Sequence, residues 1–309
     1  MIYTLTFNPA IDCYVQCGEV KLGQTNRAKT QTLAFGGKGV NVSVMLARLG
    51  VATTALGFVA GDMGEALCRY LTTEGVTEAM IRLPNGHTRI NVKLNISGEG
   101  VPATETEINA PGPHIPLTSM ADLEAQLQKL GAGDILVLSG SVPSHLPKDM
   151  YGSIAQKMQA QGVALVVDAE GELLLGTLPY APLLIKPNLQ ELSAIVGKPL
   201  VGIENLADVQ AGIAYLQSLG ARHVLVSMGG QGAMLASEGG EVYVSPALGG
   251  KAVQTVGAGD AMLAGFLAGM GQGLGYGLKL GLATGGATAM TYGLAQKSAV
   301  DALLQEAET

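Results

Sequence analysis

Short apolar runs and amphipathic stretches alternate regularly along the middle of this chain. Helices are expected over 120–130, 148–161 and 206–219, and strands over 134–138, 163–167, 183–185 and 223–227. Strands that alternate with helices in this way pair as a parallel sheet covered by helices on both faces. The pattern predicts an α/β fold, for which a chain of 309 residues with 44 glycines is long enough.

Polar residues follow these strands at the points where the strands end. Parallel strands bring their carboxyl ends to one edge, which is where open α/β sheets bind ligands. The residues concerned are Asp12, Ser139, Asp168, Lys186, Asn188 and Ser227. Asp12 also has a local interpretation, because the preceding Asn8-Pro9 pair starts turns by itself. The clustering as a whole predicts an enzyme.

Residues 255–260 read Thr-Val-Gly-Ala-Gly-Asp and run directly into a helical stretch. Glycines before a helix let backbone N–H groups converge, which makes an anion-binding helix N-terminus. Asp260 has two interpretations here. It is either an acidic first-turn residue favoured by the helix dipole, or a base that takes a proton from an attacking hydroxyl while the amides stabilise a phosphoryl group.

Residues 35–41, Phe-Gly-Gly-Lys-Gly-Val-Asn, open another helical stretch. The glycines form either a plain flexible turn or a close backbone approach to a ligand, with Asn41 bonding sugar hydroxyls. The spacing matches neither GxGxxG nor the P-loop, and the acidic residue that would bind a dinucleotide ribose is missing. A dinucleotide-binding oxidoreductase is therefore disfavoured.

Asn188 and Glu191 stand at the start of a predicted helix, after the short strand 183–185. Their spacing is that of a capping box, which is a purely structural role. Both side chains also follow a strand's carboxyl end, where they could reach a Mg²⁺ ion through its water shell. The turn 228–232 offers further backbone amides to a phosphate.

Residues 88–96 alternate with period two, which places Ile90 and Val92 on one face and Arg89 and Lys93 on the other. An ordinary strand with a solvated face has this pattern. The segment groups better with the short strands expected over 13–34, however, as a small sheet that acts as a lid with its basic residues pointing inward. We expect a single domain over 1–309, with the lid inserted at about 12–34 and 86–110.

Composition excludes several classes of partner. The net charge of −7 and the pI near 5.1 leave no basic patch for nucleic acid. No apolar run approaches the roughly 20 residues of a membrane span, and the first residues resemble a strand rather than a signal peptide. Cys13, Cys17 and Cys68 lack the spacing of a zinc site, so we expect reduced thiols in a cytoplasmic protein.

Four motifs together resemble those of the PfkB (ribokinase-like) family of carbohydrate kinases. Residues 36–41 and 255–260 look like the two family signatures, 186–191 is similar to the NxxE magnesium motif, and 227–232 is similar to the nucleotide loop. Each motif alone is weak, but four in the right order, across essentially the whole chain, are specific. The resemblance implies a three-layer αβα sandwich with a mostly parallel central sheet and a protruding β-sheet lid.

The resemblance also implies roles for individual residues. Asp260 would be the catalytic base, and the amides of Gly257, Ala258 and Gly259 the anion hole. The contacts to Mg·ATP would be Lys186, Asn188, Glu191, Ser227, Gly229, Gly232 and Thr255, with the metal held by Asn188 and Glu191. The contacts to the sugar would be Asp12, Gly37 and Asn41, and those to its phosphate Arg89, Lys93, Ser139 and either Arg27 or Lys38.

The ligands implied are ATP and a ketohexose phosphate. Segments 8–12, 88–93 and 106–113 are most similar to family members that convert fructose 1-phosphate and ATP to fructose 1,6-bisphosphate and ADP. Tagatose 6-phosphate and fructose 6-phosphate stay open as substrates, since a ketohexose has a primary hydroxyl at each end. A non-catalytic sugar-binding regulator is the alternative of a different class, although such a protein would not need Asp260.

Two further expectations come from the same resemblance. In relatives a lid of this kind often forms a homodimer in which one subunit completes the site of the other, so a homodimer through the lid sheet is expected. Some members also bind a monovalent cation near the position of Val256. Residues 288–296 lack the arginine that some relatives carry there, so this cation site stays open.

Overall fold

Mostly apolar runs form the inner strands of the central sheet, because both of its faces are covered by helices. The computed structural model describes residues 1–98 and 101–307, so that 99–100, within the segment expected to form the lid, lie outside the described residues. The strand order is β13-β12-β11-β10-β9-β8-β1-β4-β5. The bounds are β1 Ile2–Thr6, β4 Thr53–Val59, β5 Thr77–Arg82, β8 Ile135–Ser139, β9 Ala164–Asp168, β10 Leu184–Ile185, β11 His223–Ser227, β12 Ala233–Ala236 and β13 Val242–Ser245.

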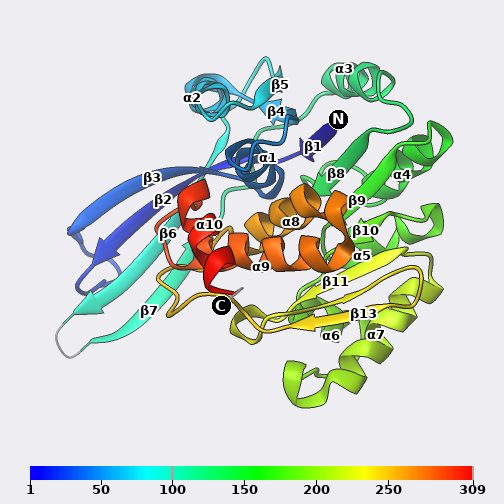
Figure 1. Ribbon diagram of the computed structural model, residues 1–309. Coiled ribbons are helices and arrows are strands. Elements are labelled where there is room, and N and C mark those ends of the chain that lie inside the picture. The colour runs from blue at the N-terminus through cyan, green and yellow to red at the C-terminus, as the bar shows by residue number, and fades with distance from the viewer. Residues whose placement is uncertain (99–100, 308–309) are drawn as a thin grey trace.

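Neighbouring strands are parallel from β5 across to β11, and β12 and β13 extend the sheet in antiparallel fashion. In β8, Leu136 and Leu138 pack into one layer of helices, whereas Val137 between them packs into the other. The helices therefore lie on both faces of the sheet (Figure 1). The predicted α/β class with a mostly parallel central sheet is confirmed.

The two helical layers differ in their place along the chain. One layer consists of α3 Leu117–Leu127, α4 Met150–Ala160, α5 Gly171–Leu175, α6 Leu189–Val196 and α7 Leu206–Ser218. The other consists of α1 Lys38–Arg48, α2 Gly61–Thr73, α8 Ala258–Gly269, α9 Leu274–Ala289 and α10 Lys297–Glu306. Helices from the two ends of the chain thus share one face, which brings the N-termini of α1 and α8 to the same side of the sheet.

A second, smaller sheet stands away from the main body (Figure 1). It consists of β2 Ala10–Cys17, β3 Thr30–Gly36, β6 Arg89–Gly98 and β7 Val101–Ile108, in the order β3-β2-β6-β7. Strand β2 is parallel to β6, and the other pairs are antiparallel. The predicted small sheet is therefore present, and we call it the lid sheet. The division into one domain with an inserted lid stays a prediction.

The lid sheet has one polar face and one apolar face. Residues that pair across neighbouring strands share a face, so Asp12 lies beside Asn91, and Ile11 beside Ile90 on the opposite side. The polar face is turned inward, since Asn91 is buried, while Ile90 on the outer face is 44% exposed. This orientation reverses the usual arrangement of a sheet with one wet face.

Several elements differ from expectation in detail. The edge strand β5 was not predicted, and α3 begins three residues before the expected helix 120–130. Short 3-10 turns cover Leu178–Tyr180, Gly202–Asn205, Gly229–Gln231 and Met270–Gln272. The three cysteines are free and buried, as expected for reduced thiols. None of the helices in the described part of the chain combines the length and apolar character needed to cross a membrane.

Candidate active site

A cavity of about 1060 Å³ lies at the carboxyl edge of the central sheet, between the main body and the polar face of the lid sheet. The predicted site residues that line it are Asp12, Gly37, Lys38, Asn41, Arg89, Lys93, Ser139, Lys186, Asn188, Glu191, Ser227, Gly229, Gly232, Thr255, Gly257, Ala258, Gly259 and Asp260. Within the described residues, Arg27 is not part of this lining and lies in an exposed loop of the lid.

The N-terminus of α8 opens into this cavity. Gly257 precedes the helix with a φ of 80°, a left-handed conformation that favours glycine. In the described part of the chain, the amides of Gly257 and Gly259 have no backbone acceptor, whereas the amide of Ala258 donates to the carbonyl of Thr255 at 3.2 Å. Free amides at a helix start favour an anion, so Gly257 and Gly259 are better placed for one than Ala258.

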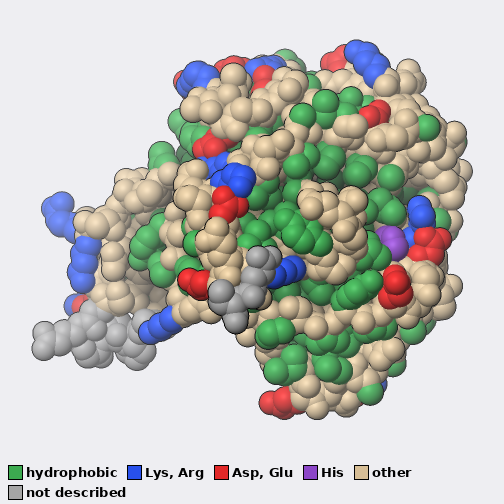
Figure 2. All heavy atoms as spheres, viewed as in Figure 1, with side chains coloured by type: hydrophobic (Ala, Val, Ile, Leu, Met, Phe, Trp, Pro, Cys, Tyr) green, Lys and Arg blue, Asp and Glu red, His purple; other side chains and the backbone are tan. Residues whose placement is uncertain are grey.

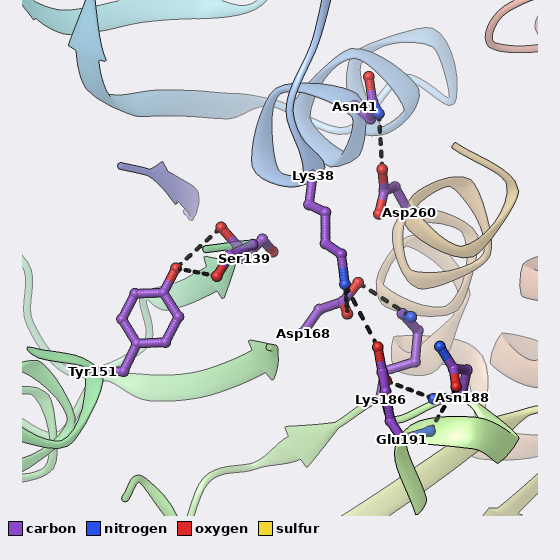
Figure 3. Close-up of polar contacts among 10 residues, drawn as sticks. Lys38, Asn41, Ser139, Tyr151, Asp168, Lys186, Asn188, Glu191 and Asp260 are labelled. Atoms are coloured by element: carbon purple, nitrogen blue, oxygen red, sulfur yellow. Dashed lines mark hydrogen bonds and ion pairs between the residues drawn. The ribbon is translucent and has the colours of Figure 1, made fainter. Parts of the chain in front are cut away.

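Asp260 lies in the first turn of α8 and is only 7% exposed. Its carboxylate oxygen Oδ2 accepts a hydrogen bond of 2.8 Å from Nδ2 of Asn41, which comes from α1 (Figure 3). Burial, together with the negative charge of Asp168, raises the pKa of Asp260 to about 7, against the opposing effects of Asn41 and two lysines. A carboxylate with such a pKa is suited to accept a proton near neutral pH.

A buried ion-pair cluster lies beside this carboxylate. Asp168, at the end of β9, is fully buried between the ammonium groups of Lys38 at 3.0 Å and Lys186 at 3.1 Å (Figure 3). Burial alone would raise the pKa of Asp168, but the two lysines lower it, so the carboxylate is charged. A Cβ atom at Gly259 would stand 3.5 Å from Nζ of Lys186, which places this lysine at the start of α8.

Asn188 and Glu191 do form the predicted capping box at the start of α6. The backbone N–H of Asn188 donates to Oε2 of Glu191, and the N–H of Glu191 donates to Oδ1 of Asn188, each at 2.8 Å. Both side chains also line the cavity, and Oε1 of Glu191 lies 4.0 Å from Nζ of Lys38. Burial raises the pKa of Glu191, although the Asn188 amide and Lys38 oppose this effect.

Asn188 and Glu191 are suited to bind a divalent cation that prefers oxygen ligands, such as Mg²⁺, and do not form a structural metal site by themselves. They offer oxygen atoms only, and no cluster of three or more His, Cys, Asp and Glu side chains suited to a metal occurs among the residues described. Mg²⁺ keeps several of its waters and is bound through one or two carboxylates plus substrate phosphates. A site with so few protein ligands therefore suits a cation that arrives with a phosphate ligand.

The opposite end of the cavity is a slot with small apolar walls. Ser227 ends β11, and Gly232 has a φ of 99° at a position where a Cβ would come within 2.1 Å of the carbonyl of Ser245. Beyond them the walls come from the loop before α8 and from α9. These residues are Ala247, Leu248, Gly249, Gly250, Ala252, Leu282, Gly285, Gly286 and Ala289. Such walls suit a flat ring held by shape.

The lid side of the cavity carries the polar groups of β2 and β6. Nδ2 of Asn91 donates to Oδ1 of Asp12 at 3.0 Å, and Oδ1 of Asn91 accepts from the amide of Ala110 at 3.2 Å. The Asp12 carboxylate is thus oriented by a neighbouring strand. At Gly37, which has a φ of 116°, a Cβ would lie 3.1 Å from Pro9, so a glycine is needed where the chain enters α1.

The basic residues of the lid already have partners. Arg89 donates to the carbonyls of Asn8 and Ala110, both at 3.2 Å, and burial lowers its pKa. Lys93 forms an ion pair of 2.5 Å with Glu107, which lowers the pKa of that carboxylate. Of these two cations, Arg89 keeps donors to spare, because a guanidinium has five N–H groups.

Ser139 at the end of β8 has a buried Oγ that lacks a hydrogen-bond partner among the described residues. The turn that carries it is fixed by Tyr151, whose hydroxyl donates to the carbonyls of Ser139 at 3.0 Å and Gly140 at 3.1 Å (Figure 3). A buried polar atom without a partner is costly, so this hydroxyl is suited to bond a ligand.

Comparison with known proteins identifies the family that uses such a site. Residues 5–300 match the model of the pfkB family carbohydrate kinases. The chain belongs to the PfkB family of carbohydrate kinases. The expected ribokinase-like fold is thereby confirmed.

Individual PfkB relatives are similar over most of the chain. A 1-phosphofructokinase of Bacillus subtilis is 42% identical over 86% of this chain and 84% of its own length. A D-tagatose-1-phosphate kinase of Bacillus licheniformis is 36% identical over 86% of this chain and 84% of its own length. The solved structure of phosphofructokinase-2 from Escherichia coli, in complex with substrates and products, has a TM-score of 0.90 at 28% identity and covers 100% of this chain and 99% of that one.

Membership of the PfkB family makes the chain a phosphotransferase that acts on a hydroxyl group and uses ATP with a divalent metal ion. Asp168, Asn91 and Glu107 are residues of the cavity region that sequence reasoning did not single out as site residues. Asp168 was visible as a polar strand end, and Asn91 shares a predicted strand face with Arg89. The small-residue walls gave no signal, since glycine and alanine in α9 look like ordinary helix packing.

Proposed function

We propose that the chain transfers the γ-phosphoryl group of ATP to the free primary hydroxyl of D-fructose 1-phosphate, giving D-fructose 1,6-bisphosphate and ADP. The observation that carries the proposal is the buried Asp260, with a pKa of about 7, at a helix N-terminus where the amides of Gly257 and Gly259 have no backbone acceptor among the described residues. The names of the relatives support fructose 1-phosphate as the acceptor.

In this proposal Asp260 removes the proton of the attacking hydroxyl as its oxygen forms a bond to the γ-phosphorus. The bond from phosphorus to the bridging oxygen breaks, and the electron pair leaves with ADP. The amides of Gly257 and Gly259 stabilise the negative charge on the transferring group, and Ala258 joins them once its own amide leaves the Thr255 carbonyl. Asn41 keeps the base oriented through the bond to Oδ2.

The nucleotide end of the cavity would hold Mg·ATP. We assign Lys186, Ser227, Gly229, Gly232 and Thr255 to the phosphates, and the apolar slot to the adenine ring. Asn188 and Glu191 would hold Mg²⁺, which supplies positive charge to neutralise the phosphates. The monovalent cation expected near Val256 stays a prediction, which a titration of turnover with K⁺ tests.

The sugar end would be bound by groups that already converge there. Asp12, Gly37 and Asn41 are assigned to the sugar hydroxyls, and Arg89, Lys93 and Ser139 to the phosphate already on the substrate. The strongest of the latter are Arg89, with spare donors, and Ser139, with its unpartnered Oγ. Lys38 lies between the two halves, and its pair with Asp168 keeps its charge in place.

Tagatose 1-phosphate is the second candidate acceptor, because one of the relatives carries that name. Fructose and tagatose differ in the configuration of one hydroxyl, which changes binding by only about 1–3 kcal/mol. Tagatose 6-phosphate and fructose 6-phosphate, the alternatives from the sequence, present the same two groups with the phosphate at the other end.

We further propose that the lid segments, about 12–34 and 86–110, form an insertion in one kinase domain and join two copies of the chain. The outer face of the lid sheet exposes Leu33 at 55%, Ile90 at 44% and Ile108 at 61%, which suits a partner sheet. Figure 2 shows Lys and Arg side chains at the far end of the lid, the region of the loop that carries Arg27. In a homodimer this arginine would reach the cavity of the other subunit.

The experiment that tests the reaction is a coupled ADP-release assay with Mg·ATP. Fructose 1-phosphate, tagatose 1-phosphate, tagatose 6-phosphate, fructose 6-phosphate and fructose are compared as acceptors. We expect fructose 1-phosphate to give the highest kcat/KM. A higher value for a tagatose phosphate would replace the substrate but keep the chemistry, whereas no turnover with any of them would favour a non-catalytic sugar-binding regulator.

A further inference from the structure

A single hydrogen bond between side chains joins the lid sheet to the loop that precedes α8, within the described residues. Nε2 of Gln254 donates to the hydroxyl oxygen of Tyr14 at 2.6 Å, and the two residues are 240 positions apart in the chain. The bond is half-buried. It therefore connects the lid sheet to the main body directly, in addition to the segments of chain that join the lid strands to the main body.

On the main-body side, Gln254 is held close to the anion hole. The amides of Val253 and Gln254 both donate to the carbonyl of Ala289, at 2.8 and 3.1 Å, which ties the loop to the end of α9. Gly257 follows three positions later and Asp260 three positions after that. A displacement of Gln254 is thus transmitted along a very short stretch of backbone to the amides and the base.

On the lid side, Tyr14 shares strand and face with the sugar-contact residue Asp12. Tyr14 also pairs in register with Lys93 of β6, on the polar face that lines the cavity. Burial, and then the charge of Asp12, raises the pKa of Tyr14 to about 12, so its hydroxyl is neutral at physiological pH. The oxygen of this hydroxyl accepts the bond from Nε2 of Gln254 through one of its lone pairs.

We propose that the Tyr14–Gln254 pair is a latch that couples the position of the lid over the sugar to the geometry of the anion hole. Tyr14 is then a positioning residue: it is not among the residues that line the cavity, and it acts through Gln254. The proposal rests on the proposed kinase function for its substrates, but the contact itself is a property of the fold. The latch ties the lid to the loop, so a ligand that holds one of them in place also restricts the other.

The coupling is the free energy by which a ligand at one site changes the binding of a ligand at the other site. By thermodynamic linkage, the two ligands must change each other's affinity by the same factor. Sugar phosphate bound under the lid would strengthen nucleotide binding, and nucleotide would strengthen sugar binding by the same factor. Removing the bond would abolish the coupling without removing a contact to either ligand. If the two residues were needed only for stability, their substitution would instead lower the affinity for each ligand measured alone.

The test is a binding experiment by calorimetry, with fructose 1-phosphate and the non-hydrolysable analogue AMP-PCP with Mg²⁺ as probes. For the unmodified chain we expect each probe to lower the Kd of the other by at least about fivefold, which is at the low end of typical couplings. In Tyr14→Phe and in Gln254→Leu the factor should fall to near one, while each probe alone binds within about twofold of the unmodified value. The double variant should behave like either single variant.

Tyr180→Phe is the matched control, because it removes a tyrosine hydroxyl from the 3-10 turn Leu178–Tyr180, outside the cavity lining. Retention of the full coupling in Tyr14→Phe and Gln254→Leu would overturn the latch, as would equal weakening of both probes alone or the absence of coupling in the unmodified chain. Turnover is measured separately. A chain that couples the two probes but releases no ADP contradicts the proposed reaction and leaves the latch standing.

Discussion

The central sheet and the lid sheet meet at the same cavity but differ in where their polar side chains lie. Apolar helix layers cover both faces of the central sheet, and the charged groups that it brings to the cavity lie at its carboxyl edge, in a cluster around Asp168. The lid sheet turns a polar face to the cavity and an apolar face outward. In the proposed function, the main body thus places the reacting groups, whereas the lid contributes substrate contacts and a surface for a second copy.

The comparison predicts that the largest loss of turnover follows a change in the main body. Asp260→Asn keeps the shape of the side chain but removes the base, so we expect kcat to fall by about 10²–10⁴-fold. The affinity for fructose 1-phosphate, measured by calorimetry, should stay within a few-fold. A variant with kcat near the unmodified value would show that Asp260 is an ordinary first-turn residue.

A change at Asp168 tests whether the buried cluster matters as a unit. Asp168→Asn leaves Lys38 and Lys186 without their carboxylate, and loss of one partner of a buried pair costs about 3–5 kcal/mol of folding free energy. We expect a lower melting temperature and, from misplaced lysines, a fall in kcat of about 10²-fold.

Asp134→Asn is the control for that variant, since Asp134 pairs with the N-terminal amine at the start of β8. Its effect on turnover should be negligible. Equal activities of the two variants would mean that the cluster serves stability alone.

The pH dependence of kcat/KM reports on the same cluster. Because the pKa of Asp260 is raised to about 7, the base is protonated below that pH. Activity should therefore rise tenfold for each pH unit up to about 7 and then level off. In Asp168→Asn the rise should move to lower pH, because the charge of Asp168 helps to raise that pKa. A flat profile from pH 5 to 8 would contradict the assignment of the base.

The smallest effect on turnover is expected at the outer face of the lid. Leu33→Glu places a charge on the apolar surface, so light scattering after gel filtration should show a monomer instead of a dimer. If Arg27 completes the neighbouring site, the KM for fructose 1-phosphate should rise about tenfold, as expected for one charge-assisted hydrogen bond.

Leu117→Glu, at a leucine that is also exposed and begins α3, is the matched control. It should leave both the oligomeric state and the KM unchanged. If light scattering shows that the unmodified chain is a monomer, the proposed dimer through the lid sheet is wrong.

Strands with a clear apolar run were predictable from the sequence, and strands interrupted by charged residues were not. The strand at 223–227 has the bounds expected from its apolar run. Strand β5 escaped notice because Glu78 and Arg82 interrupt it, and these two residues form an ion pair with one another at the edge of the sheet. The hydrophobic pattern of a segment indicates how far its side chains are buried. An edge strand is less buried than an inner strand, so its pattern is weaker.

The edge that carries the site was predictable from the polar strand ends, but the pairs within it were not. Lys38 and Asp168 are 130 positions apart, and Asn41 and Asp260 are 219 apart. Nothing local in the sequence says which carboxylate meets which lysine, since this depends on how the layers pack. Period-two alternation placed Arg89 on the polar face of its strand, and the lid hypothesis turned that face inward. Its bonds to backbone carbonyls, however, are visible only in the structure.

During synthesis, the central sheet can be assembled in the order in which its strands leave the ribosome. Each strand from β9 to β13 pairs with the strand made just before it, and β8 pairs with β1. Every addition thus needs only chain that already exists. Asp260 follows the last of these strands and must reach back to Asn41 on α1. A nascent chain therefore has all the strands of its central sheet before Asp260 can contact Asn41, so the proposed base is in place only after α8 has folded.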